Sequence, residues 1–185
     1  MRLDTLLALT LSYFALRLLC DGSRLAGRKF HIWLSVSPDL RSYVRKDLCA
    51  LDAEHIPCEL MDNKMNHREE MVLFVTYAKL AQSQDSLEKL VTLAGGDNFE
   101  GCLVLDECHR AKNFSANVDK ASTVTGKRVV ELQSRLPNAR VIYSSATMCS
   151  EAKHVAYMTR LGLWGNANEY RTFLGRRNTD NILLM

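Results

Sequence analysis

Four near-continuous apolar runs, each ending in polar residues, constrain the fold of this 185-residue chain more than any other feature. The runs are FHIWLSVS (30–37), MVLFVTYAKL (71–80), GCLVLDECH (101–109) and ARVIYSSAT (139–147). Strands covered on both faces are apolar throughout, whereas half-exposed strands alternate apolar and polar residues. Because helical patterns separate the runs, we predict an α/β fold, a parallel sheet with helices on both faces.

Helices are predicted between the runs from apolar spacing and from residues that favour helix ends. They cover residues 38–51, 86–96, 125–137 and 150–165, with Ser150 as the N-cap of the last. The segment HIPCELM (55–61) fits a short additional strand, and the run 71–80 is expected to close in a Thr-Tyr turn. The tail, residues 166–185, is predicted to be irregular.

Composition sets only broad limits on function. The chain is 47% hydrophobic and 24% charged, which suits one domain with a substantial core. A net charge of +3 permits an acidic partner such as nucleic acid but does not require one. The six cysteines are scattered and form no Cys-x-x-Cys pair, which favours reduced, intracellular thiols over a disulfide framework.

The N-terminal segment, residues 1–26, leaves two interpretations open. A basic start followed by an apolar stretch is typical of a signal peptide. Asp4 and Arg17 interrupt that stretch, and the helical spacing of Leu7, Leu11 and Phe14 favours a buried or amphipathic helix. The helix is the preferred interpretation, and a secreted or membrane-anchored protein is the alternative.

The sequence DECH follows the third apolar run, and its carboxylates are candidate catalytic residues. In parallel sheets the working residues lie at the carboxyl ends of strands. Asp106 at such an end can hold Mg²⁺, and Glu107 can orient a water for attack on a phosphate. His109 can connect this site to a neighbouring loop. The competing interpretation is a solvated acidic turn, which the buried strand before it makes less favourable.

The sequence SSAT ends the fourth run and offers two hydroxyls around Ala146. Ser145 and Thr147 suit a loop that contacts an imidazole or a carboxylate on the neighbouring strand. Taken alone, the better interpretation is a turn that caps the next helix.

Taken together, DECH and SAT resemble motifs II and III of superfamily 2 helicases. The likeness extends from about Gly27 to about Gly165 and is similar, segment by segment, to the helicase-like ATPase domain of the strawberry notch family. The matching segments are WLSVSPDLRSYVRKDL, LFVTYAKL, LVTLAGGDNFEGCLVLDECHRAKN, TGKRVVELQSRLPNARVIYSSAT and AYMTRLGLWG. The resemblance implies a RecA-like P-loop NTPase domain over 27–165, incomplete at both ends.

Residue roles follow from this resemblance. It implies that Asp106 and Glu107 are the Mg²⁺ and water-activating carboxylates of an ATP site, and that His109 couples to Ser145 and Thr147. It also implies a nucleic-acid backbone contact for five residues at two other strand ends. These are Ser37, Pro38, Asp39, Thr76 and Tyr77. From their composition alone, both stretches would be interpreted as ordinary turns.

No phosphate-binding loop of the form Gly-x4-Gly-Lys-Ser/Thr occurs in the 185 residues. The pair Gly126-Lys127 lacks the earlier glycine and the following hydroxyl. Phosphoryl transfer depends on positioning and electrostatics, so we expect negligible ATPase activity from this polypeptide alone. The resemblance implies ATP and Mg²⁺ for the intact domain and leaves their binding by this chain open.

The preferred functional interpretation is a partial helicase-type ATPase domain of a nuclear protein that regulates transcription through chromatin. The resemblance implies DNA, histones or transcription factors as partners, and a second RecA-like domain outside this chain. A non-catalytic chromatin or protein-interaction module that keeps only the fold is the alternative. No membrane association is expected under either of these interpretations.

Overall fold

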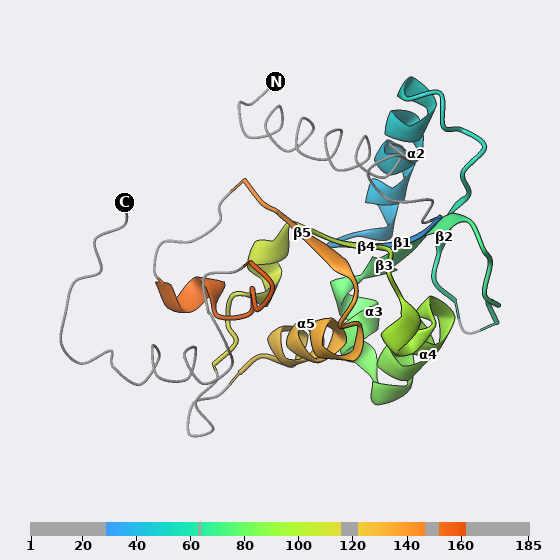
Figure 1. The fold of residues 1–185 in the computed structure, drawn as a ribbon. Coiled ribbons are helices and arrows are strands. Elements are labelled where there is room, and N and C mark those ends of the chain that lie inside the picture. The colour runs from blue at the N-terminus through green and yellow to red at the C-terminus, as the bar shows by residue number, and fades with distance from the viewer. Residues whose placement is uncertain (1–28, 63, 116–121, 147–151, 162–185) are drawn as a thin grey trace.

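A five-stranded parallel sheet forms the centre of the structure, a computed structural model that describes residues 29–62, 64–115, 122–146 and 152–161 (Figure 1). The strands lie in the order β2-β3-β1-β4-β5, and each neighbouring pair is parallel. Their bounds are β1 (Phe30–Ser35), β2 (Cys58–Leu60), β3 (Met71–Thr76), β4 (Cys102–Asp106) and β5 (Arg140–Ser144). The predicted α/β fold with a parallel sheet is confirmed.

Helices cover both faces of this sheet. One face carries α2 (Arg41–Ala50), and the opposite face carries α3 (Tyr77–Gln82), α4 (Gln84–Ala94) and α5 (Val124–Arg135) (Figure 1). Short 3-10 helices complete the described elements: η1 (Pro38–Leu40), η2 (Gly96–Asn98), η3 (Cys108–Ala111) and η4 (Ala152–Val155). This two-sided cover explains why the strand sequences are apolar at successive positions.

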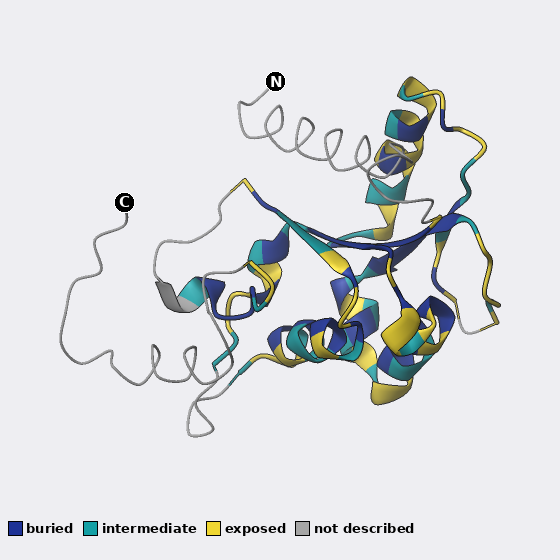
Figure 2. Cartoon of the chain, in the orientation of Figure 1, coloured by how far each residue is buried: buried dark blue, intermediate teal, exposed yellow. Residues whose placement is uncertain are grey.

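Alternate residues of β1 enter two separate cores. Trp33 belongs to the cluster that contains Leu48 of α2, whereas Ile32 and Leu34 belong to the larger cluster with Leu90 of α4. The side chains of β1 are all buried, and Figure 2 shows the sheet as the most buried layer. A strand with no exposed face fixes its register strongly, because a one-residue slip would exchange its two sets of core contacts.

The position of β1 creates a crevice at the carboxyl edge of the sheet. The chain leaves β1 toward α2 on one face, whereas it leaves both flanking strands, β3 and β4, toward helices on the other face. Connections that diverge in this way open a gap beyond the strand ends, where α/β proteins commonly bind ligands. The ends of β1, β3 and β4 therefore line the position expected for a ligand site.

Two local predictions are wrong. The Thr-Tyr turn expected after β3 is the start of α3, because Thr76 Oγ1 accepts a hydrogen bond from Lys79 N at 3.1 Å and caps a helix there. The helix predicted over 150–165 is, within its described part, only η4 followed by turns. Gln133 Nε2 donates to the carbonyl of Tyr157 at 2.9 Å, and burial of this segment against α5 replaces helical hydrogen bonds.

Several predictions fall outside the described residues. They concern the N-terminal segment 1–26, the cap at Ser150, the loop residue Thr147 and the tail 166–185. Within the described part, the four cysteines are free thiols, as predicted: Cys49, Cys58, Cys102 and Cys108. None of the described helices is long and apolar enough to cross a bilayer.

Candidate functional site

Asp106 and Ser35 end the two neighbouring strands β4 and β1, and their side chains meet. The parallel register pairs Leu34 with Leu105, which brings the next residue of each strand to the same level. Ser35 Oγ donates a hydrogen bond to Asp106 Oδ2 at 2.7 Å. This bond holds the carboxylate at the edge of the crevice, beside a hydroxyl that is itself fully buried.

Burial raises the pKa of the Asp106 carboxyl above its usual range, while the hydrogen bond from Ser35 acts in the opposite direction. The negative charge of Glu107 adds to the increase. The indole Nε1 of Trp33 is buried beside this carboxyl and has no hydrogen-bond partner of acceptable geometry in the described structure. Asp106 is therefore a desolvated acid, and a nearby cation would stabilise its charged form.

Glu107 adopts a left-handed backbone conformation, with φ 49° and ψ 46°. This conformation is uncommon for a residue with a side chain and costs about 1 kcal/mol. Such strain is found often at functional sites, where the surrounding structure maintains it. The turn separates the directions of the two acids: Asp106 contacts Ser35 of β1, whereas Glu107 contacts His109 of its own loop.

His109 connects the Glu107 carboxylate to the end of β5. Its Nδ1 lies 3.1 Å from Glu107 Oε2 and 3.0 Å from Ser145 Oγ. An unprotonated Nδ1 would place its lone pair against the Glu107 carboxylate, which is repulsive at that distance. We therefore assign the proton to Nδ1, which donates it to both oxygens. The contact between His109 and Ser145 expected from the sequence is present, while Thr147 lies outside the described residues.

Tyr77 supports the acidic turn through a hydrogen bond, a role that was not predicted from the sequence. Its hydroxyl donates to the main-chain carbonyl of Asp106 at 2.9 Å, and its side chain is only 5% exposed. Beside it Cys108 is fully buried, which raises the pKa of that thiol to about 11 and keeps it neutral. The spacing of Tyr77 and Leu80 along α3 is the signal that could have placed the ring in the core.

Ser37, Pro38, Asp39 and Thr76 follow or end strands at the same edge of the sheet and, in the described structure, form no hydrogen bond to the two acids of the DECH turn. Ser37 Oγ accepts a hydrogen bond from Asp39 N at 3.3 Å and caps η1, and Pro38 and Asp39 are exposed. Thr76 is half-buried and caps α3. The ring of Tyr77 points into the protein, so any contact between this residue and nucleic acid would be made through its main chain.

Comparison with known proteins relates this chain to a family of NTP hydrolases. Residues 19–180 match the family described as P-loop containing NTP hydrolase pore-1. The strawberry notch homolog of Caenorhabditis elegans is 40% identical over 168 residues, covering 80% of this chain. This chain belongs to the strawberry notch family. Mouse strawberry notch homolog 2 is 40% identical over 159 residues, and Drosophila strawberry notch is 38% identical over 176 residues.

The match covers most of this chain but a small part of each relative. The chain spans 9% of the Caenorhabditis elegans protein and 11% of the mouse and Drosophila proteins. It therefore corresponds to part of the P-loop NTP hydrolase domain of strawberry notch proteins. The five-stranded parallel sheet agrees with that family, in which binding of a nucleoside triphosphate is the shared property.

Proposed function

We propose that this chain forms one wall of the nucleotide site in a helicase-like, ATP-hydrolysing domain of a nuclear strawberry notch protein. The observation that supports this proposal is the row of polar contacts across three neighbouring strand ends. Ser35 of β1 holds Asp106 of β4, and His109 links Glu107 to Ser145 beyond β5. A solvated acidic turn would need neither the buried donor nor the shared imidazole proton.

The donor set fits a hard cation shared with a nucleotide. Asp106 and Ser35 present oxygen atoms only, and Mg²⁺ prefers one or two carboxylates together with water and phosphate oxygens. The described residues contain no group of three or more His, Cys, Asp and Glu side chains that could hold a metal alone.

Each residue of the wall has a separate proposed role. Asp106 holds the Mg²⁺, and Ser35 keeps the carboxylate oriented. Glu107 orients the attacking water and accepts its proton. When bound, Mg²⁺-ATP would supply the transferable phosphoryl group, and the positive charge of Mg²⁺ would offset the cost of burying the Asp106 carboxylate. His109 contacts both Glu107 and Ser145, so a movement of Glu107 in the nucleotide site would also move the loop after β5.

Nucleic acid is proposed to lie along the neighbouring strand ends, against Ser37, Pro38, Asp39 and Thr76. These residues follow β1 and β3 at the same edge as the acids, and the Pro38–Asp39 turn is exposed. In the whole protein, we propose that this contact serves regulation of transcription through chromatin. DNA, histones or transcription factors are the proposed partners, and a second RecA-like domain is proposed to complete the cleft.

The test uses a chimera, because this sequence lacks a Gly-Lys-Ser/Thr loop. The segment of the Caenorhabditis elegans homolog that precedes the matched region is joined to this chain, and ATP turnover is measured with Mg²⁺. We expect turnover that falls at least about 100-fold with Glu107→Gln, and no turnover from the chain alone. Glu54→Gln, at an exposed carboxylate, is the control. Turnover that survives Glu107→Gln would contradict the role proposed for Glu107. A chimera without turnover would favour a module that keeps only the fold.

Cellular location is tested separately with a fluorescent protein fused to the carboxyl end of the chain. The proposal requires nuclear fluorescence and an uncleaved N-terminus, read by mass spectrometry. A cleaved N-terminus with secretion would support the secreted alternative and contradict the nuclear role.

A further inference from the structure

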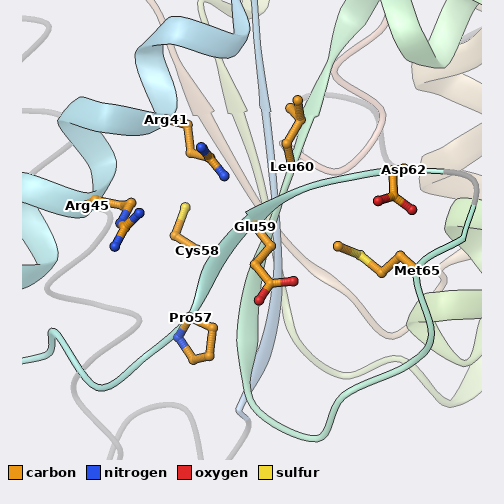
Figure 3. Close-up of a pocket in the computed structure, with 8 residues that line it drawn as sticks. All are labelled: Arg41, Arg45, Pro57, Cys58, Glu59, Leu60, Asp62 and Met65. Atoms are coloured by element: carbon orange, nitrogen blue, oxygen red, sulfur yellow. The ribbon is translucent and has the colours of Figure 1, made fainter.

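A pocket of about 450 Å³ lies between α2 and the edge strand β2, away from the acidic turn. Figure 3 shows two arginine side chains entering it from α2, on either side of the Cys58 thiol. The pocket shares no residue with the proposed nucleotide wall. Its lining consists of Arg41, Arg45, Pro57, Cys58, Glu59, Leu60, Asp62 and Met65.

The two arginines carry positive charge that no acid in the described structure neutralises. Arg41 and Arg45 are one helical turn apart, which places both on the same side of α2. The thiol between them stays neutral, because burial raises the pKa of Cys58 to about 12. An anionic group from outside the pocket could therefore pair with both guanidinium groups.

The two acids of the pocket already have their own partners. Glu59 Oε1 accepts a hydrogen bond from Arg68 at 2.7 Å, and this contact is also an ion pair. Asp62 Oδ1 accepts from the main-chain N–H of Lys64 at 2.7 Å. Among the described residues, Glu59 is thus paired with a cation outside the pocket lining, whereas Arg41 and Arg45 form no ion pair.

The strand that forms the floor of the pocket has a free edge. β2 is the outermost strand on its side of the sheet and pairs only with β3 among the described residues. Leu60 at its end is 39% exposed, unlike the fully buried residues of the central strands. An unpaired strand edge is a template for a further extended segment, and main-chain hydrogen bonds supply the affinity in such complexes.

We infer that this surface binds an extended acidic peptide segment, which adds to the edge of β2 and places its carboxylates against Arg41 and Arg45. The apolar side chains of Pro57, Leu60 and Met65 suit alternate residues of such a strand. A nucleic-acid backbone is less suitable, because it would pair with the two guanidinium groups but has no peptide N–H and C=O groups to match the free edge of β2.

The test measures fluorescence polarisation of a labelled eight-residue peptide of alternating Val and Glu with the full 185-residue chain. We expect saturable binding that weakens at least about tenfold with Arg45→Glu, the scale of one lost charge-assisted contact. Lys46→Glu makes the same charge change at the next residue, where the ammonium lies over the exposed Tyr43 ring at 5.5 Å and outside the pocket. This control should change affinity less than twofold.

Three further probes separate strand addition from other forms of binding. An eight-residue peptide of alternating Val and Lys should not bind. Two Val-Glu peptides, one N-methylated at every Val and the other at every Glu, should differ in affinity, because the N–H groups of only one set face β2. Equal binding of both methylated peptides, or of the Val-Lys peptide, would overturn the proposal. So would a single-stranded oligonucleotide that binds more tightly than the Val-Glu peptide and is released by Arg45→Glu.

Discussion

The ends of β3 and β4 lie on either side of β1, and the structure uses their polar residues in different ways. After β4, the side chains of Glu107 and His109 keep 28% and 30% of their surface exposed and contact each other. After β3, Thr76 caps a helix and Tyr77 turns inward, where its hydroxyl holds the carbonyl of Asp106. The end of β4 presents partly exposed polar groups, and the end of β3 stabilises the turn that carries them.

This difference shows that a polar residue at a strand end has two distinct uses. The loop after β4 contains a residue in a strained conformation, Glu107, and that strain requires support from its surroundings. The support comes from the end of β3, through Tyr77, and from the buried Cys108 of the same loop. The residues that define the site chemically are therefore not the residues that hold it in place, and substitution can separate the two groups.

The largest expected effect is on stability and comes from the supporting side. Tyr77→Ala removes a buried ring from the larger core and should lower the free energy of unfolding by about 3–5 kcal/mol in urea denaturation. Tyr43→Ala is the matched control, because that tyrosine is 51% exposed on α2 and should change stability by less than about 0.5 kcal/mol. Equal losses for both variants would refute a supporting role for Tyr77.

Tyr77→Phe sharpens the comparison, since it keeps the ring and removes only the hydroxyl that donates to Asp106. We expect a loss of about 1–2 kcal/mol in the free energy of unfolding, because the partly buried carbonyl loses its donor. Amide hydrogen exchange at Glu107 and Cys108 should also accelerate. The control is Tyr43→Phe, and an unchanged exchange rate in Tyr77→Phe would show that the turn holds its shape without this bond.

The sequence predicted the sheet well because burial of strands on both faces leaves a direct record in the apolar runs. It predicted the contact between His109 and Ser145 because DECH and SAT occur in a recognisable order. The supporting role of Tyr77 was not predicted, because the Thr-Tyr pair was interpreted as a turn, whereas the helix that buries the ring begins there. The helix over 150–165 was wrong because buried residues such as Tyr157 follow helical spacing while Gln133 binds the backbone of a turn.

The acidic side of the comparison should respond to pH. Burial raises the pKa of Asp106, so the folded state prefers its neutral form. The contribution of this group to stability is complete below its unfolded pKa and is lost as pH rises through the folded pKa. Asp106→Asn should therefore stabilise the protein at pH 7 by about 1 kcal/mol, a gain typical of replacing a functional residue. The gain should shrink as pH falls to about 4.

Urea denaturation at both pH values measures this difference, with Asp39→Asn as the control. Asp39 is exposed in the turn after β1, so its substitution should change stability by less than about 0.5 kcal/mol at either pH. A loss of stability in Asp106→Asn at pH 7 would mean that the Ser35 hydrogen bond outweighs the cost of burying the charge. The acid would then be a structural residue, like Tyr77.

The smallest expected effect concerns the strained backbone of Glu107. Asparagine tolerates the left-handed region better than other residues with a side chain, so Glu107→Asn should raise the free energy of unfolding by about 0.5 kcal/mol. Glu107→Gln loses the same charge beside His109 but keeps the strain, and its stability should not increase. If the two variants are equally stable, the conformation carries no cost in this turn. If only Glu107→Asn is stabilised, the strain has a measurable cost, and the turn retains glutamate at the expense of stability, as expected for a functional residue.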